Sequence, residues 1–296
     1  MICLPYNQKL NQPLVLALGF FDCMHLGHKQ LVDTAKQLAK DSQSKTAVFT
    51  FSNNHFSVLN KSEKLLFTFE ERITLFQNVG VDFAVYATFD KEFMSTDAQT
   101  FLTTLKNTFQ LKGIVVGFDY TCGKDRKDCF FVKNFFEKYD IPTKIVQQVN
   151  FENEKISSTR IRKLLSINLD KANQLMAHQY FLVGTVEKGR GCGKTMGFPT
   201  ANVKVEDDKL LPLGVFTADV EVDDKTYKSI VNIGPQPTFG LEEKVVIEAF
   251  LQDFQGDLYQ KQVVITPKKF IREVKKFNSK EQLVAQLKQD LEKIYD

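Results

Sequence analysis

The sequence predicts an α/β protein in which a parallel sheet covered by helices is followed by an antiparallel β-barrel or sandwich with a terminal helix. In the first half, buried-strand runs alternate with amphipathic stretches. Past about residue 180, short β-rich runs separated by Gly and Asp-Asp breaks take over, which is typical of an antiparallel barrel or sandwich. The 296 residues suffice for two domains of ordinary size.

The first strand of this half is predicted by the run 13–18, which is apolar on both faces, as in a sheet covered by helices on both sides. The predicted strands are 13–18, 46–51, 83–89, 113–117 and 144–149. Between them lie three helical patterns: Leu31, Ala35 and Leu38 after His28; 70–79 with Ile73 and Phe76; and Phe101, Leu105 and Phe109 spaced by four. In parallel sheets ligands bind beyond the carboxyl ends of the strands, so these ends are where we expect a site.

The second half is predicted to hold the strands 181–186, 214–222, 227–233, 245–250 and 262–267. Ser279 and Gln282 have the spacing of a capping box, followed by the apolar stripe Leu283, Leu287, Leu291 and Ile294, so the chain should close with a helix. The intervening region has a helical pattern. We therefore expect domains at 1–165 and 181–296, joined by a helical linker at 166–180.

Composition excludes several classes of protein. A 43% hydrophobic and 25% charged content is that of a folded domain, and no apolar run reaches the ~20 residues of a membrane helix. The start has no basic region followed by a long apolar core, so no signal peptide is expected. The net charge of +3 is too small to predict a nucleic-acid partner, and neither nucleic acid nor membrane is expected as one. Five cysteines without a CxxC pair disfavour a disulfide framework or structural zinc and fit a cytoplasmic location. The oligomeric state stays open.

The first candidate site is Gly19-Phe20-Phe21-Asp22-Cys23-Met24-His25-Leu26-Gly27-His28, where the first strand runs into a helix. His25 and His28 are three residues apart at a helix start, so both imidazoles can face one point. Gly27 lets a ligand approach the backbone, and helix N-terminal amides attract phosphate. Neutral or protonated imidazoles at this point could stabilise the charge on a phosphate in the transition state. The alternatives are surface histidines or zinc ligands, and no third zinc ligand is evident nearby.

The second element is Ile156-Ser157-Ser158-Thr159-Arg160-Ile161-Arg162, just past the last strand of the first half. Ser157 or Ser158 can cap the following helix, while free amides and Arg162 hold phosphate oxygens. The alternative is a plain N-cap with a solvated arginine.

Together the two elements resemble the nucleotidylyltransferase superfamily, which carries HxGH and (I/V)SSTxxR motifs. The resemblance implies a Rossmann-like domain in which His25 and His28 are catalytic and the ATP phosphates are bound by Gly19, Phe20, Asp22, Gly27, Ser157, Ser158, Thr159 and Arg162. A loop at 115–124 resembles the flavin-phosphate loop of bacterial FAD synthetases, which implies flavin binding by Asp119 and Tyr120. The alternative for this loop is an ordinary strand-to-loop transition.

A third motif, Gly189 to Thr195, is not a Walker A loop. The pattern GxxxxGK[ST] would need a glycine at position 188, which is Lys188. A Walker A loop is also followed by a helix, and Pro199 opposes one here. The glycines are better suited to a flap that folds over phosphates, with Gly189, Gly191, Gly193 and Lys194 as its phosphate-binding residues. Thr200 and Asn202 alternate along a predicted strand, and their oxygens suit Mg²⁺; the alternative is two surface residues.

The string GKTMGFPTAN resembles the riboflavin kinase signature, as do Asn232-Ile233-Gly234-Pro235-Gln236-Pro237-Thr238-Phe239 and the strand around Glu248. The resemblance implies a Greek-key barrel in which Glu248 is the catalytic base that deprotonates the flavin ribityl 5′-hydroxyl. The alternative for Glu248 is a solvent-facing position on an alternating strand.

Nearly the whole chain, from about Val15 to Asp290, is similar to bacterial bifunctional riboflavin kinase/FAD synthetases. The resemblance implies Mg²⁺ as cofactor, ATP as co-substrate, and riboflavin, FMN, FAD and ADP as the other substrates and products. Two other interpretations are an adenylyltransferase with another acceptor, which would lack a kinase barrel, and a barrel that only binds protein or RNA, which Thr200, Asn202 and Glu248 oppose.

Several residues depart from the family pattern: Cys23, Cys122, Asp125, His178, Phe250 and Gln260. Because Cys23, Cys122 and Cys192 fall in the proposed binding loops, we expect thiol alkylation to inhibit, with protection by ATP or flavin.

Overall fold

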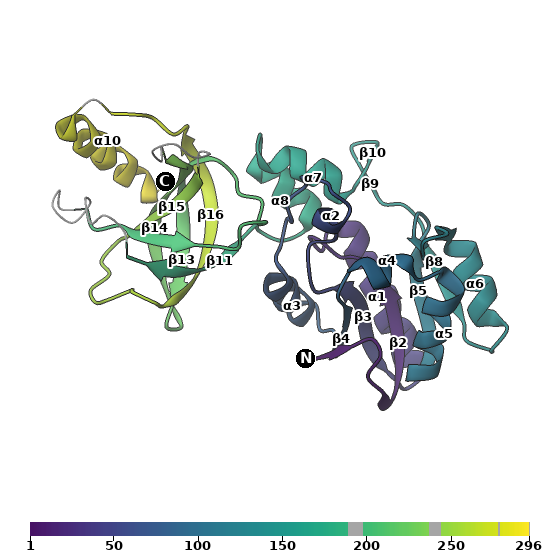
Figure 1. The fold of residues 1–296 in the computed structure, drawn as a ribbon. Coiled ribbons are helices and arrows are strands. Elements are labelled where there is room, and N and C mark those ends of the chain that lie inside the picture. The colour runs from purple at the N-terminus through teal and green to yellow at the C-terminus, as the bar shows by residue number, and fades with distance from the viewer. Residues whose placement is uncertain (189–197, 237–243, 278, 296) are drawn as a thin grey trace. The chain divides into compact units, whose positions relative to one another are not determined.

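The computed structural model describes residues 1–188, 198–236, 244–277 and 279–295, and the chain divides into two compact units, Met1–Ile161 and Arg162–Asp296 (Figure 1). No helix in these described ranges is long and apolar enough to cross a membrane.

The first unit is a six-stranded, fully parallel sheet in the order β1-β4-β3-β2-β5-β8. Its strands are β1 (Ile2–Pro5), β2 (Leu10–Leu18), β3 (Lys45–Phe51), β4 (Phe83–Ala87), β5 (Phe109–Gly117) and β8 (Thr143–Val146). Its helices are α1 (Leu26–Asp41), α2 (His55–Val58), α3 (Phe69–Asn78), α4 (Lys91–Ser95), α5 (Ala98–Thr108), α6 (Cys129–Glu137) and α7 (Ser158–Leu165), the last running into the second unit. Two short hairpins complete it: β6 (Thr121–Cys122) with β7 (Lys127–Asp128), and β9 (Asn150–Phe151) with β10 (Glu154–Lys155).

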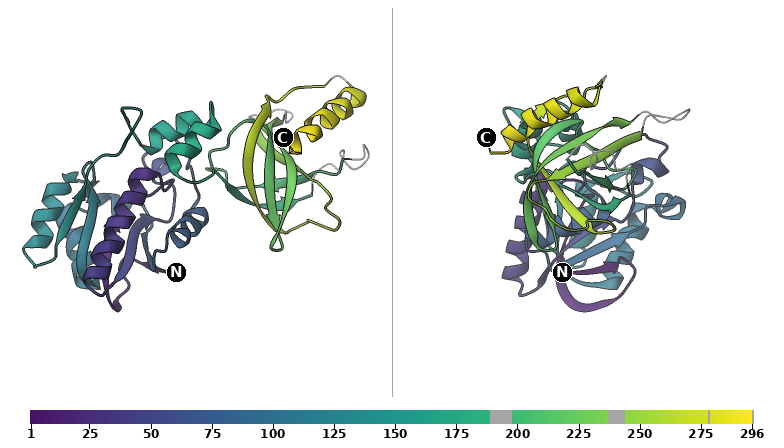
Figure 2. Two further views of the ribbon diagram at one scale, coloured as in Figure 1. Left: turned by 180° about the vertical axis from the view of Figure 1, so that it is seen from behind. Right: turned by 90° about the vertical axis from the view of Figure 1, so that its left-hand side faces the viewer.

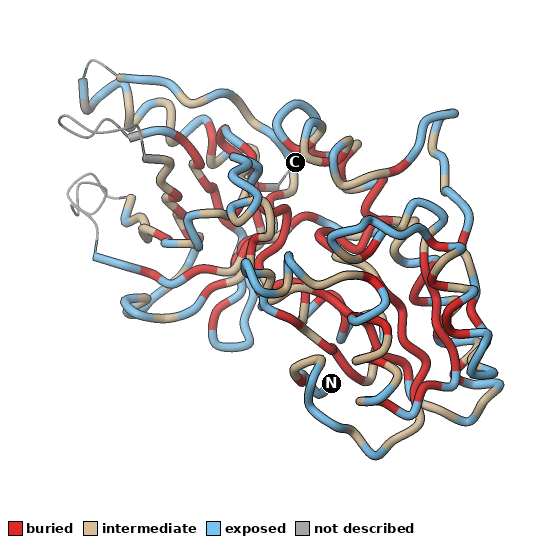
Figure 3. The backbone as a smooth tube through the Cα atoms, turned by 45° about the vertical axis from the view of Figure 1, so that its right-hand side comes forward, coloured by how far each residue is buried: buried red, intermediate tan, exposed pale blue. Residues whose placement is uncertain are grey.

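Helices cover both faces of this sheet, as the two-sided apolar strands predicted (Figures 1 and 2). Leu14, Leu16 and Leu18 of β2 lie in one core cluster with side chains of α5 and α6. The alternate residues Val15 and Ala17 are equally buried and lie on the face that α1 covers. In Figure 3 the buried segments follow these strands.

Two details of the first unit differ from expectation. Phe109 does not continue the helical face of Phe101 and Leu105, because its backbone is extended and it begins β5 beside Leu10. The edge strand β1 was not expected, since its four apolar residues form only a short run that ends in Pro5.

The second unit contains a closed antiparallel barrel in the order β11-β12-β15-β14-β13-β16. Its strands are β11 (Leu182–Glu187), β12 (Ala201–Lys204), β13 (Gly214–Val222), β14 (Lys225–Gln236), β15 (Lys244–Leu251) and β16 (Gln262–Arg272). Three consecutive strands, β13 to β15, form a meander, and β16 returns beside β13, which is the Greek-key order. Of the two predicted architectures, the barrel is therefore the one found.

Helices flank this barrel in the chain: α8 (Leu169–Met176) before it, and α10 (Lys280–Glu292) followed by the short turn η1 (Lys293–Tyr295) after it. The predicted cap is present, because the Ser279 hydroxyl accepts a hydrogen bond from the backbone N–H of Gln282. Ile294 packs with Val215 and Ile230, so the end of the chain lies against strands β13 and β14.

Candidate active sites

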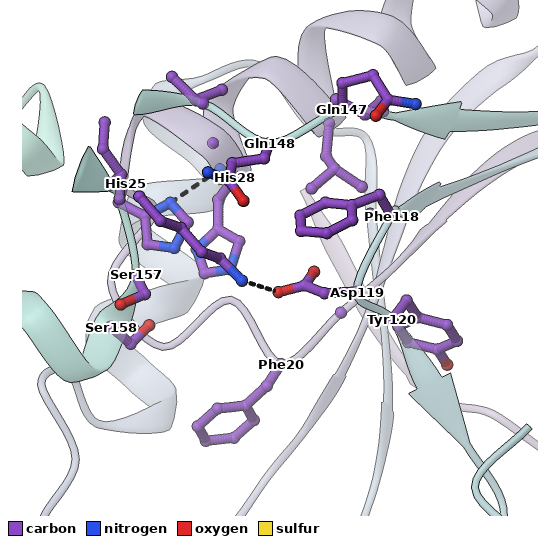
Figure 4. A pocket seen from close by; sticks show the side chains of 18 of the residues that line it. Phe20, His25, His28, Phe118, Asp119, Tyr120, Gln147, Gln148, Ser157 and Ser158 are labelled. Atoms are coloured by element: carbon purple, nitrogen blue, oxygen red, sulfur yellow. Dashed lines mark hydrogen bonds and ion pairs between the residues drawn. The ribbon is translucent and has the colours of Figure 1, made fainter. Parts of the chain in front are cut away.

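The first pocket lies where the sheet order reverses. From β2 the chain builds outward to β3 and β4 on one side and to β5 and β8 on the other, so the loops after β2 and β5 diverge. Between them is a pocket of about 260 Å³. Its lining includes Gly19, Phe20, His25, Gly27, His28, Phe118, Asp119, Tyr120, Gln147, Gln148, Lys155, Ser157 and Ser158 (Figure 4).

The two histidines of the HxGH motif are held as a stacked pair at the start of α1. Their ring centroids are 3.6 Å apart and the planes differ by 9°. His25 is the N-cap, and its Nδ1 accepts a hydrogen bond from the backbone N–H of His28 at 3.1 Å. Since Nδ1 accepts, a neutral His25 carries its proton on Nε2. A Cβ at Gly27 would lie 3.1 Å from Cε1 of His25, so glycine leaves room for this ring.

Both imidazoles are uncharged at neutral pH. Burial lowers the pKa of His25 to about 4, and its side chain is only 8% exposed. Burial, followed by the neighbouring His25, lowers the pKa of His28 well below its usual value. Of the two protonation states that the sequence left open, the structure favours neutral rings, which can donate hydrogen bonds to a phosphate but add no positive charge.

Lys155 supplies the positive charge among the described residues that line this pocket. Its ammonium group pairs with the carboxylate of Asp119 and lies 5.0 Å from the ring centroid of Phe118. In Figure 4 the dashed line of this ion pair ends on Asp119, in the pocket that the two imidazoles, Ser157 and Ser158 also line. Sequence reasoning missed Lys155, although it stands directly before the Ile156–Arg162 motif.

The two serines of that motif both line the pocket, and their hydroxyls have different partners. Ser157 caps α7, because its hydroxyl accepts from the backbone N–H of Arg160 at 3.3 Å. Ser158 lies with its hydroxyl 3.6 Å from the sulfur of Cys23. The chain thus brings two segments 135 residues apart together at one pocket.

Three predicted phosphate-binding residues are not among the lining residues. Asp22 is 1% exposed, and its carboxylate accepts from the backbone N–H of Leu66 at 3.2 Å. Thr159 is exposed and Arg162 is half-buried, both on α7. By contrast, the predicted flavin-binding residue Tyr120 lines the pocket, and burial raises its pKa well above 10, so its hydroxyl stays protonated.

The structure contradicts the expected thiol sensitivity at two of its three positions. Cys23 is fully buried, and Cys122 is 8% exposed. Burial and then the nearby Asp125 raise the pKa of Cys122 to about 12, which disfavours the reactive thiolate. Cys192 lies outside the described residues, as do Gly189, Gly191, Gly193 and Lys194.

The second pocket, of about 160 Å³, lies on the outer face of the barrel and is closed by α10. Its lining consists of Phe198, Thr200, Val215, Ile230, Asn232, Glu248, Phe250, Arg272, Val274, Lys275, Phe277, Leu283, Leu287 and Asp290. Glu248 lies between Ile247 and Ala249, which are 2% and 1% exposed and fill the barrel interior. Its own side chain therefore points outward, into this half-covered pocket rather than into open solvent.

The predicted metal ligands lie beside Glu248. Asn202 of β12 is paired directly opposite Glu248 of β15, and Thr200 lines the same pocket. A hydroxyl, an amide and a carboxylate are oxygen donors that suit Mg²⁺ shared with phosphates and water. The described residues contain no cluster of three or more His, Cys, Asp or Glu able to hold a metal.

An ion pair between Arg272 and Asp290 forms part of the lining of this pocket. Nε and a terminal nitrogen of Arg272 donate to the carboxylate of Asp290, at 3.1 and 2.7 Å. Asp290 has no exposed surface and also accepts from the amide of Gln286. The pair fixes α10 to the last strand of the barrel.

Comparisons with known proteins agree with this division of the chain. A family model described as FAD synthetase matches residues 7–160, and one described as riboflavin kinase matches residues 176–296. The bifunctional riboflavin kinase/FMN adenylyltransferase of Listeria monocytogenes is 35% identical over 93% of this chain and 90% of its own length. The protein of the same name from Bacillus subtilis is 33% identical, with the same two coverages.

A solved structure gives a similar result for the fold. A crystal structure from Streptococcus pneumoniae, titled macrolide-efflux protein, covers 100% of this chain and 99% of its own with a TM-score of 0.89 and 33% identity. With both family models matched in order and curated relatives similar over almost their full length, the chain belongs to the family of bifunctional riboflavin kinase/FMN adenylyltransferases.

Proposed function

We propose that this protein phosphorylates riboflavin to FMN with ATP and then transfers AMP from a second ATP to FMN, giving FAD and pyrophosphate. One observation carries the proposal: among the described residues, two different predicted motifs each line a pocket of their own. The histidine and serine pocket lies within the stretch similar to FAD synthetase, and the Glu248 pocket within the stretch similar to riboflavin kinase.

In the adenylyl transfer, a phosphate oxygen of FMN attacks the α-phosphorus of ATP and pyrophosphate leaves. No covalent protein intermediate is needed, because the FMN phosphate is itself the nucleophile. His25 and His28 donate hydrogen bonds to the phosphates, and Ser157 and Ser158 bind them at the start of α7. Phosphate contacts by Gly19, Phe20, Asp22, Gly27, Thr159 and Arg162, and flavin contacts by Asp119 and Tyr120, stay predictions from the family pattern.

In the phosphorylation, Glu248 takes the proton of the ribityl 5′-hydroxyl. The new bond joins that oxygen to the γ-phosphorus of ATP, the bond to the β,γ-bridging oxygen breaks, and ADP leaves. Thr200 and Asn202 would hold Mg²⁺, which neutralises phosphate charge when bound. The residues Gly189, Gly191, Gly193 and Lys194 are proposed to cover the phosphates as a flap.

The proposed domain boundaries are 1–165 for adenylyl transfer and 181–296 for the kinase, with 166–180 as the linker. The end of the first compact unit at Ile161 and the family matches to 160 and from 176 support boundaries in this region. We also propose a cytoplasmic location, which the four free cysteines of the described residues support.

The test is chromatography of riboflavin, ATP and Mg²⁺ incubated with the protein, in which both FMN and FAD should form. Glu248→Ala should stop FMN formation and spare the conversion of supplied FMN to FAD, and His28→Ala should do the reverse. Variants that lower both steps equally would contradict the assignment of one step to each pocket.

A further inference from the structure

Asn232 of β14 faces Glu248 directly. The two residues are opposite each other in the antiparallel register of β14 and β15, and the Asn232 amide nitrogen donates to Oε2 of Glu248 at 3.5 Å. Val231 and Ile233, its neighbours on β14, are fully buried in the barrel, so Asn232 shares the outer face and the pocket with Glu248.

The other end of this amide has no partner. The carbonyl oxygen of Asn232 is buried and accepts no hydrogen bond from the described residues. An unpaired buried acceptor is unfavourable, and an apolar residue of similar volume would avoid it. Turning the amide around would instead point its oxygen at the carboxylate, where two acceptors repel. The unpaired oxygen is explained if the protein needs an N–H donor at Glu248.

We propose that Asn232 is a positioning residue for the kinase reaction: its amide N–H holds one carboxylate oxygen of Glu248, so that the other oxygen faces the hydroxyl to be phosphorylated. The inference rests on the proposed kinase function and adds a residue to that site. Among the described residues, the Asn232 amide is the group that donates a hydrogen bond to the side chain of Glu248. A free carboxylate would rotate between orientations, and fewer of them would suit proton removal.

The charged groups around the pocket leave this role to a neutral amide. Arg272 of β16 is engaged by Asp290 of α10, and Lys275, after β16, is the other cation in the lining. Strands β12 and β14 contribute no charged side chain to the lining. A cation beside Glu248 would stabilise the ionised carboxylate and make it a weaker base. A neutral amide orients the carboxylate by a hydrogen bond and leaves it able to accept a proton.

The experiment compares Asn232→Leu, Asn232→Asp and the control Thr226→Val, an exposed position on the same strand. FMN formation is followed by chromatography, with kcat and KM for riboflavin, after the wild-type chain has been shown to form FMN. We expect Asn232→Leu to lower kcat about 10- to 100-fold with KM within about threefold. Thr226→Val should leave both unchanged.

Asn232→Asp is the variant of nearly identical shape, and it separates positioning from packing. It replaces the N–H donor by a second carboxylate oxygen, so kcat should fall as in Asn232→Leu although the packing is kept. A wild-type kcat in Asn232→Leu or in Asn232→Asp overturns the proposal. A wild-type chain that forms no FMN overturns the kinase function instead.

Discussion

The burial of His25 makes the stability of this protein depend on pH, and the effect can be isolated by one substitution. We consider His25→Asn, which removes the titrating ring. Asparagine is a favourable N-cap, so its side chain can still accept from the backbone N–H of His28 that the imidazole now satisfies. The variant thus keeps the start of α1 while abolishing the proton-binding group.

The size of the effect follows from the two pKa values. His25 has a pKa of about 4 when folded against 6.5 when unfolded. Between them the unfolded chain binds a proton that the folded chain does not, so the free energy of unfolding falls as pH drops through this window. The full loss is about 3.4 kcal/mol below pH 4, and about 2 kcal/mol of it has accrued between pH 8 and pH 5.

The assay is urea denaturation followed by circular dichroism at pH 8 and pH 5, since the chain has no tryptophan for fluorescence. The wild-type chain should lose about 2 kcal/mol more than His25→Asn between the two pH values. Equal losses in the two proteins would show that His25 is either exposed or already protonated when folded, and would refute the neutral histidine pair.

Three further predictions use the same preparations. Glu248→Gln keeps the shape of the side chain but cannot accept the proton, so FMN formation should fall about 10²- to 10⁴-fold while FAD formation from supplied FMN is unchanged. Gly27→Ala places a methyl group 3.1 Å from the His25 ring, so FAD formation should fall about 10- to 100-fold with FMN formation intact; equal rates in wild type and variant would contradict the close packing. Iodoacetamide should modify the exposed Cys3 of the folded chain, and mass spectrometry should find Cys23 modified only after urea is added.

The parallel sheet could be predicted from the sequence because strand runs alternate with helical patterns and the run 13–18 is apolar on both faces. Strand β2 ends directly before Gly19, so the rule for parallel sheets also located the first pocket at the carboxyl end of that strand. The short edge strand β1 and the start of β5 at Phe109 were not predicted. Each depends on pairing with a neighbouring strand, β4 for β1 and β2 for Phe109, more than on the local sequence pattern.

The surroundings of the candidate residues were less predictable than the residues themselves. Alternation along β15 indicates that Glu248 faces away from the barrel interior, but it does not tell what covers that face; only the placement of α10 shows that it is a pocket. Similarly, the ion pair of Lys155 with Asp119 joins β10 to the loop after β5, 36 positions apart, and no spacing rule relates the two residues. Side-chain pairs of this kind arise from tertiary structure alone.

The salt bridge of Arg272 with Asp290 has a consequence for sequence variation. Removing either partner leaves a charge buried without its counter-ion, at a cost of about 3–5 kcal/mol, whereas replacing both by apolar residues is often neutral. These two positions, 18 residues apart, should therefore be inherited as a unit among natural variants: both charged or both apolar, and seldom one of each. A variant that breaks this joint inheritance should carry a second change nearby that restores the charge balance.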